Sequence, residues 1–518
     1  MTTKYHQLLI LDRPCKYCKV LELKDLQHGG KMRHDQHNNP YVDFGEVEVT
    51  EAMNAEKGTT VLMAIDALKS AMSTEPKEPK VLPKSELKLG YQRSDILPNL
   101  PGLATTANQG CAFCKVLRDD LISANLQDGT SDTEESCAKE RAIPMEIVIT
   151  EVTYQFREFE TGSELHEDDP KIWLDSLYVY FTVTSGVENI EKSLHYNFCT
   201  DASDLCAKWF SLGRLPVVND RLSAPNLDRI KALISRALEE KPIENVHQEF
   251  LPTRLLDLES DCSSGLRLVV TKGDPEISKL DPIQKRYAAL SYCWGYAVAW
   301  ALDTSGSMLY ALFREVKKIG TRNHFQCRIY TQIASLHCVI EGNSCLSGFL
   351  EPAYSPPTVQ INFQSEIHKS ISGALYLRML HPPHETLKVF SEQIGKPIGK
   401  PDNPSSADFE EAAWEERGWT FQEDQLSPRK LYFGKRMAYM SSGKLCEAAD
   451  GTRFSRETYV NMENTLGQTL SGWYNLVKAY TERKLSFEHD KLPAISAFAR
   501  NICDRFPHQK YFGWPLGI

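Results

Sequence analysis

The chain has 518 residues and a formal net charge of -10, with 59 Lys and Arg against 69 Asp and Glu. This length exceeds what one hydrophobic core supports, so we expect two or three domains. The acidic balance argues against a general nucleic-acid binder, and we find no apolar run long enough to span a bilayer. We therefore expect a protein of the cytosol or nucleus, with cytoplasmic as the working assignment.

The first expected region is residues 1–135, a Cys-containing region of loops and one helix. The segment "GCAFCKVLRDDLISANL" predicts an amphipathic helix over residues 110–126, because its apolar residues recur at helical spacing. These apolar residues are Phe113, Val116, Leu117, Leu121 and Leu126.

Two C-x-x-C pairs stand out among the 14 cysteines, most of which should be reduced thiols or metal ligands in a reducing compartment. The pairs are Cys15 with Cys18, and Cys111 with Cys114. Each pair lets two thiolates reach one tetrahedral ion, and two pairs complete a Cys₄ zinc site with sulfurs about 3.5–4 Å apart. The second pair begins a helix, where the amide dipole favours thiolate.

Other interpretations of these cysteines stay open. The two pairs are farther apart than in a compact zinc ribbon, so four reduced cysteines are the alternative to zinc. His34 and His37 can replace one pair as ligands. Thioredoxin-like chemistry is disfavoured, because neither pair lies between a clear strand and helix of a βαβ unit.

The second expected region, residues 136–250, is a small antiparallel β region followed by a helix. The runs "MEIVITEVTYQFREFE" (145–160) and "IWLDSLYVYFTVTS" (172–185) are rich in β-branched and aromatic residues, which predicts a hairpin with a bulge in the first strand. The segment "NLDRIKALISRALEEK" (226–241) predicts a helix with Asn226 as its N-cap.

Residues 251–450 look like an α/β domain. The run "YAALSYCWG" (287–295) predicts a buried strand that ends on glycine, and ligands bind at the carboxyl ends of strands in open α/β sheets. Further elements are expected in this order: helices over 307–320 and 328–336, a short strand in "HCVIEG", long loops over 350–406, a helix over 406–426, and a hairpin over 429–442 that turns at Gly434 and Lys435. Residues 451–518 form a closing helical segment with helices over 470–485 and 491–503.

Four blocks in this order carry a family resemblance: "LPTRLLDL", "YAALSYCWG", "RIYTQIASLHCVIEGNSCLSGFLEP" and "RGWTFQEDQLSPRKLYFG". Together they resemble the fungal heterokaryon-incompatibility (HET) domain, over roughly residues 251–499. The resemblance implies non-self recognition and programmed cell death signalling, with protein partners and self-association. The fold of this family has been likened to the TIR domain, which implies a mostly parallel α/β sheet. Some TIR domains cleave NAD, so the resemblance also raises NAD as a substrate.

The chain departs from the family after the first block. The family has a strand with an Asp-x-Leu-Cys-Ile pattern, whereas here "FREVKKIGTRNHFQC" leads straight into "RIYTQIAS". We therefore expect the sheet to lack one strand, or to be filled irregularly, between the helix that ends at Gly320 and the helix that begins near Arg328. Either the domain is degenerate, and serves as a non-enzymatic interaction module, or a coding segment is missing from the sequence.

Glu423 is the candidate catalytic residue, because a carboxylate in a pocket can hydrogen-bond ribose hydroxyls or stabilise cationic charge at an anomeric carbon. The alternative is an ion pair with Arg417 or Arg429. Core packing is the alternative for the tryptophans in the motif. The other motif or ligand-pocket residues are Ser291, Tyr292, Trp294, Gly295, Arg417, Trp419 and Gln422.

Overall fold

The protein divides into two compact units. The computed structural model describes residues 8–48, 81–83, 85–125, 145–158, 170, 172–185, 188–218, 220–240, 251–257, 267–279, 287–292, 335–340, 357–379, 407–410, 412–443, 445–456 and 466–505. Unit 1 comprises Met1–Pro216 and Tyr354–Pro404, and unit 2 comprises Val217–Ala353 and Ser405–Ile518. These units cut across the four regions expected from the sequence, because a later segment of the chain returns to the first unit.

An eight-stranded sheet is the centre of unit 1. In spatial order its main path is β1 (Leu8–Ile10), β15 (Thr358–Gln364), β16 (Ser372–Arg378), β10 (Glu188–Cys199), β9 (Ile172–Ser185), β8 (Met145–Glu158) and β6 (Glu86–Lys88), while β7 (Arg93–Leu97) also pairs with β8. The expected hairpin is confirmed as β8 and β9, and a register shift between Ile149 and Glu151 supplies the bulge. The expectation of a small sheet is wrong, because strands from earlier and later parts of the chain pair with this hairpin to form the eight-stranded sheet.

The hairpin of β15 and β16 lies in a segment that we expected to be mostly loops. It pairs with β10 through β16 and with β1 through β15. Val359, Ile361 and Phe363 alternate along β15 and are buried. This alternation fixes the face of β15 that packs into the core, whereas its partners lie far away in the sequence and leave no local signal.

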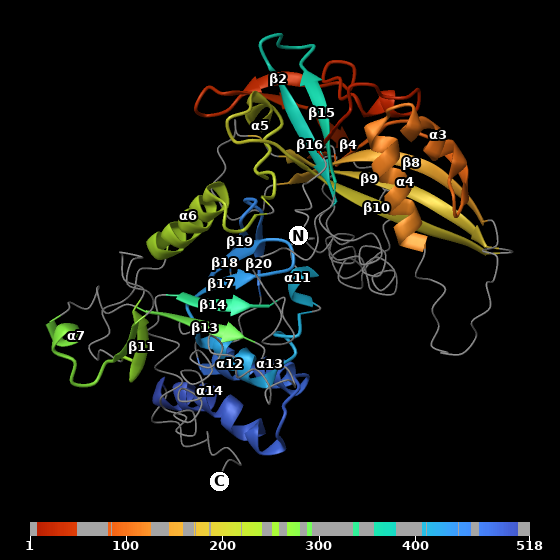
Figure 1. Cartoon of the computed structure of the whole chain (residues 1–518). Coiled ribbons are helices and arrows are strands. Elements are labelled where there is room, and N and C mark those ends of the chain that lie inside the picture. Colours follow the sequence, from red (N-terminus) through yellow and green to blue (C-terminus); the bar gives the residue numbers. More distant parts are fainter. Residues whose placement is uncertain are drawn as a thin grey trace, which may run out of the picture. The chain divides into compact units, whose positions relative to one another are not determined.

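Helix α4 (Ala112–Asn125) lies over β8, β9 and β10, and helix α3 (Pro101–Asn108) lies beside α4 and packs against β7 (Figure 1). Helix α4 confirms the amphipathic helix, and Phe113, Leu117 and Leu121 are fully buried. The remaining elements of this unit are η1 (Cys18–Leu21), β2 (Lys31–His34), β3 (Pro40–Asp43), β4 (Glu46–Glu48), β5 (Val81–Pro83) and α5 (Leu205–Trp209).

Unit 2 contains a six-stranded mixed sheet. Its order is β13 (Ala288–Tyr292), β14 (Ser335–Val339), β17 (Arg429–Phe433), β18 (Ala438–Ser442), β19 (Leu445–Ala448) and β20 (Arg453–Ser455). Pairings β13–β14 and β14–β17 are parallel, and the other three are antiparallel. The sheet is therefore not mostly parallel as expected, because short turns after β17 close consecutive hairpins instead of crossovers. The first of these hairpins confirms the expected turn at Gly434 and Lys435.

The helices and remaining strands of unit 2 are α6 (Ala224–Glu240), β11 (Arg254–Asp257), β12 (Arg267–Val270), α7 (Pro275–Lys279), α11 (Ala407–Glu410), α12 (Gly418–Leu426), α13 (Leu466–Thr481), η4 (Glu488–Asp490) and α14 (Lys491–Arg505). The two closing helices are confirmed as α13 and α14. Asn226 is not an N-cap, because α6 begins at Ala224 and the Asn226 amide donates to the carbonyl of Arg221 at 2.9 Å. None of the helices in the described ranges is long and apolar enough to cross a bilayer.

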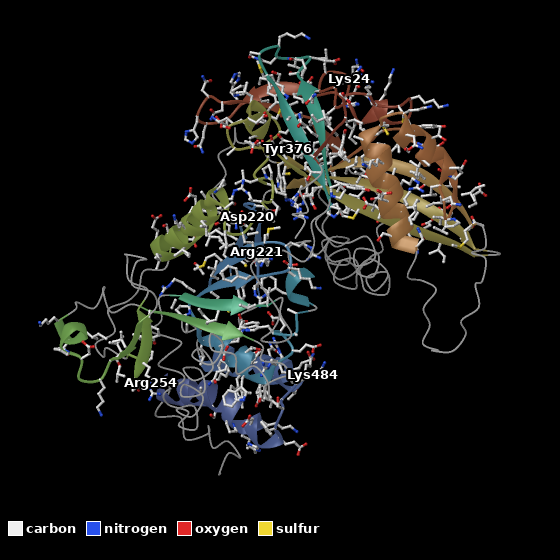
Figure 2. The ribbon with its side chains drawn as sticks, in the orientation of Figure 1. Lys24, Asp220, Arg221, Arg254, Tyr376 and Lys484 are labelled. Atoms are coloured by element: carbon white, nitrogen blue, oxygen red, sulfur yellow. The ribbon has the colours of Figure 1, made fainter. Side chains whose placement is uncertain are left out.

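The single helix expected over 406–426 is divided into α11 and α12. The intervening backbone forms hydrogen bonds with Lys484, whose amide donates to Glu416 and whose carbonyl accepts from Gly418 at 2.9 Å. Figure 2 labels Lys484 at this point of unit 2. A Cβ atom on Gly418 would lie 2.6 Å from the Leu485 side chain, so any larger residue at this position would have to displace Leu485.

Part of the expected architecture falls outside the described residues. This applies to the helix over 307–320, to most of the helix over 328–336, and to the expected gap between them. Strand β14 begins at Ser335, inside the end of the segment expected to be helical. Among the described strands, β13 pairs directly with β14.

Candidate functional site

The two C-x-x-C pairs of unit 1 come together in one cluster. Cys18 begins η1 and Cys15 lies three residues before it, while Cys114 is in the first turn of α4 and Cys111 immediately precedes that helix. The four sulfur atoms all lie within 4.8 Å of one another. Cys15 is half-buried and the other three are buried. The sequence therefore identified a set of four side chains that the fold brings to one point.

The spacing of the sulfurs fits a tetrahedral ion. The Sγ atom of Cys114 lies 3.6 Å from that of Cys15 and 3.5 Å from that of Cys18. Four Zn–S bonds of ~2.3 Å in a tetrahedron place the sulfurs about 3.8 Å apart. Four cysteine sulfurs, if all ionised, would form the soft donor set of a closed structural site rather than an open catalytic one.

The thiols do not ionise independently, because they share hydrogen bonds. The hydrogen bond with Cys18 lowers the pKa of Cys15 to about 6. The hydrogen bond with Cys111 raises the pKa of Cys114 to about 12. The cluster by itself thus favours a mixture of thiols and thiolates, whereas a divalent cation would favour four thiolates.

The histidines that we considered as replacement ligands lie elsewhere in the local structure. His34 is exposed at the end of β2, and His37 is exposed in the turn between β2 and β3. The four cysteines make a complete ligand set without them.

The second group of candidate residues lies in unit 2, where the end of β13 meets α12. The Ser291 hydroxyl donates a hydrogen bond to the half-buried carboxylate of Glu423. The indole Nε1 of Trp414 donates to the Ser291 oxygen at 2.6 Å. Ser291 is thus buried between the two groups and holds Glu423 in one orientation. Trp414 was not anticipated, because a tryptophan inside a segment expected to be one helix gives no sign of this contact.

The other motif residues on α12 are spread over its faces. Gln422 is fully buried, and among the described residues neither of its amide atoms has a hydrogen-bond partner. The indole of Trp419 donates to Asp490 at 3.1 Å. Arg417 is the N-cap residue of α12, and its carbonyl accepts from the Thr420 hydroxyl at 2.8 Å. These contacts give Trp419 and Arg417 a role in fixing the helix.

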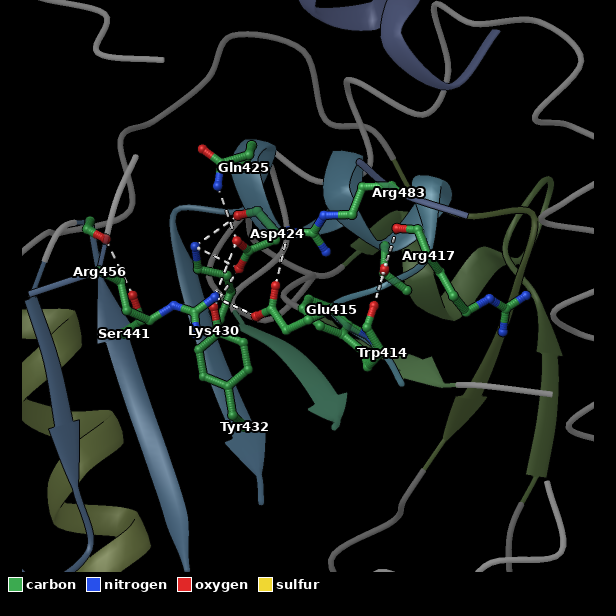
Figure 3. A network of polar contacts seen from close by, with 12 residues as sticks. Trp414, Glu415, Arg417, Asp424, Gln425, Lys430, Tyr432, Ser441, Arg456 and Arg483 are labelled. Atoms are coloured by element: carbon green, nitrogen blue, oxygen red, sulfur yellow. Dashed lines mark hydrogen bonds and ion pairs between the residues drawn. The ribbon is translucent and has the colours of Figure 1, made fainter. Parts of the chain in front are cut away.

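Asp424, next to Glu423, is the centre of a buried charge network (Figure 3). Lys430 lies 3.3 Å from one of its carboxylate oxygens, and Arg456 lies 3.5 Å from the other. Burial alone would raise the pKa of Asp424, but these two cations outweigh it and hold the pKa well below its usual range.

Glu415 extends this network. It lies 2.6 Å from Arg456 and 3.0 Å from Arg483. The Arg483 guanidinium also lies over the Phe421 ring of α12, at 5.0 Å from the ring centroid. The network therefore joins α12 to the strands of the sheet and to the segment after α13.

Some of the candidate residues cannot be placed. Trp294 and Gly295 lie outside the described residues, and so does the expected approach of Trp294 to α12. Tyr292 ends β13, but its side chain is not described. Comparison of the chain with family models, curated proteins and solved structures found no match.

Proposed function

We propose that unit 2 is a HET-type domain, and that the protein acts in the cytoplasm in fungal non-self recognition and cell death signalling. The observation that carries this proposal is the hydrogen bond between Ser291 and Glu423, which joins the opening and closing blocks of the resemblance across 132 positions. Two blocks on separate units would have argued against one domain. The proposal implies protein partners or self-association, through which such a signal passes.

An NAD-directed activity is the enzymatic form of this proposal. Glu423 is half-buried and oriented by Ser291, and the buried amide of Gln422 next to it has no hydrogen-bond partner among the described residues. In NAD hydrolysis the bond between nicotinamide and ribose breaks, and water supplies the new oxygen at the anomeric carbon. A fixed carboxylate stabilises the positive charge that develops at this carbon.

A non-enzymatic interaction module is the second candidate. Ser291 forms hydrogen bonds with both Trp414 and Glu423. Glu423 is therefore part of the contact that holds α12 against β13. The buried network around Asp424 adds to this rigidity. A rigid framework of this kind suits recognition of another protein, and it does not need the strand that is expected to be missing from the sequence.

The two forms are separated by measuring nicotinamide release from NAD by the purified full-length chain. The test variant is Glu423→Gln, which keeps the shape and removes the charge. The matched control is Glu416→Gln, since Glu416 is on the same segment, is 54% exposed and pairs with Lys484. Release by the wild type and by Glu416→Gln, but not by Glu423→Gln, supports the enzymatic form.

Inducible expression in a fungal host tests the shared part of the proposal. We expect loss of viability with the wild type and with Glu416→Gln. Cell death without NAD consumption supports the interaction module. Absence of both cell death and NAD consumption contradicts the HET proposal.

We also propose that Cys15, Cys18, Cys111 and Cys114 bind one zinc ion. The observation that carries this is the convergence of four sulfurs within 4.8 Å. Bound zinc would supply folding free energy to an N-terminal arm of short elements. The test is the zinc content of the purified protein, with one ion per chain expected and loss of that ion in the Cys111→Ser, Cys114→Ser double variant. Full zinc in the double variant would overturn the proposal.

A further inference from the structure

Arg93 of β7 is a buried cation beside the cysteine cluster. Only 7% of the Arg93 surface is exposed to solvent. Arg93 makes no ion pair with a carboxylate in the part of the chain that the structure describes. Asp95, its near neighbour on β7, instead accepts backbone hydrogen bonds from Gly102 at 3.1 Å and Leu103 at 2.7 Å. Burying a guanidinium without a negative partner is costly, so the position of Arg93 calls for another source of negative charge.

The contacts of Arg93 point to the sulfurs as that source. Its Nη1 atom donates to the Sγ atom of Cys114 at 3.5 Å. Its guanidinium also lies over the ring of Tyr17, at 4.6 Å from the centroid, and donates to the Thr106 hydroxyl at 3.3 Å. Tyr17 lies between Cys15 and Cys18, so Arg93 contacts both C-x-x-C segments.

We propose that Arg93 is a positioning residue of the metal centre, which neutralises part of its charge and holds its two halves together. This rests on the proposed zinc site. Four thiolates and one divalent ion carry a net charge of -2, and a single guanidinium reduces the total to -1. The hydrogen bond to Cys114 draws electron density from that sulfur, so the sulfur is less readily protonated or attacked by an electrophile. The ion should then leave more slowly.

The consequence concerns the lifetime of the bound metal. Second-sphere partners of metal ligands change affinity by about 10–100-fold when they are removed. We therefore expect Arg93→Gln to release zinc about tenfold or more faster than the wild type. Arg93→Lys keeps the charge but loses the planar stacking group, so its rate should lie between the two.

The experiment follows zinc transfer from the full-length protein to a chromogenic chelator, 4-(2-pyridylazo)resorcinol. The control is Arg118→Gln. Arg118 is on α4, like Cys111 and Cys114, but it hydrogen-bonds to the Asn99 carbonyl at 3.1 Å and to the Asp119 carboxylate at 3.5 Å. We expect this control to release zinc at the wild-type rate.

Replacing zinc with cobalt supplies a spectroscopic measurement that would not change if Arg93 only packed against the cluster. We expect the thiolate-to-cobalt charge-transfer band to shift in Arg93→Gln and in Arg93→Lys, and to stay in place in Arg118→Gln. Faster release with an unchanged band would reduce Arg93 to a packing residue and overturn the proposal, as would wild-type release rates in both variants. If Arg93→Gln does not fold, Arg93→Lys decides by the same two measurements.

Failure of the underlying zinc proposal is distinguishable from failure of this one. A wild-type protein without stoichiometric metal contradicts the zinc site itself. A wild-type protein that holds one ion, with an Arg93→Lys variant identical to it in release rate and cobalt spectrum, contradicts only the role of Arg93.

Discussion

Trp414 donates its indole hydrogen bond to Ser291 across 123 positions of sequence, and both side chains are buried. We predict that Ser291→Ala destabilises the protein by about 1–3 kcal/mol, because the Trp414 nitrogen loses its acceptor. Urea unfolding followed by tryptophan fluorescence measures this. Ser278→Ala is the control, since Ser278 is exposed and, among the described residues, its hydroxyl bonds within its own turn, to the carbonyl of Asp274 at 2.7 Å. Equal stability of the two variants would contradict the prediction.

The second prediction concerns Asp120 of α4. Burial raises its pKa to about 7 from an ordinary value of 3.8, and a hydrogen bond from Tyr196 at 2.7 Å offsets this only in part. The folded state therefore keeps a proton that the unfolded state loses above pH 3.8. Its contribution to stability is complete below that pH and is lost as the pH rises towards 7.

Replacing Asp120 with Asn should remove this loss. We expect the stability of Asp120→Asn relative to wild type to rise between pH 4 and pH 7, by up to about 4 kcal/mol, and to level off above pH 7. Asp119→Asn is the control, because the Asp119 side chain is 62% exposed on the same helix. Denaturant unfolding measured across this pH range tests the prediction. A stability difference between Asp120→Asn and wild type that does not change with pH would contradict it.

The third prediction compares a buried and an exposed ion pair. Asp424→Asn leaves the buried Lys430 without the carboxylate that faces it and removes one of the two carboxylates beside Arg456, so we expect a loss of about 3–5 kcal/mol. Glu416→Gln removes an exposed pair with Lys484 and should cost no more than about 1 kcal/mol. Denaturant unfolding of both variants measures the contrast. Similar small losses in both would mean that the network contributes little to stability.

The fourth prediction concerns metal removal. If zinc holds the cysteine cluster, a strong chelator should increase amide hydrogen exchange in β7 and at the start of α4, which flank the sulfurs. Exchange in β17 and β18 of unit 2 should stay the same. Mass spectrometry of peptides from each unit measures both. Equal changes in the two units would argue against a local stabilising role for the metal.

Local patterns predicted the elements that carry strong periodicity. The hairpin of β8 and β9 followed from long runs of β-branched and aromatic residues, and α4 followed from its apolar stripe. The segment 406–426 also had a helical pattern, but the backbone at Glu416 and Gly418, just before and at the start of α12, pairs with Lys484 instead of continuing one helix. Such a contact comes from a distant part of the chain, and no local propensity records it.

The same division applies to the candidate sites. The four cysteines were identifiable because each pair forms a C-x-x-C motif, and the spacing typical of metal ligands is visible within four residues. Arg93 was not, since one arginine in a short strand carries no signal until the fold places it beside Cys114. Glu423 was identified through the resemblance, whereas its contact with Ser291 depends on a tertiary arrangement that the sequence does not display.

The return of β15 and β16 to unit 1 has a consequence for how the chain matures on the ribosome. All four cysteines are present once the ribosome has reached Cys114, whereas β16 is complete only when it reaches Arg378. At ~5–20 residues per second the last strands emerge on the order of tens of seconds after the metal ligands. During this interval we expect β1, and the edge of β10 that later pairs with β16, to have no partner strand. A metal captured early would hold the arm in place until its late partners arrive.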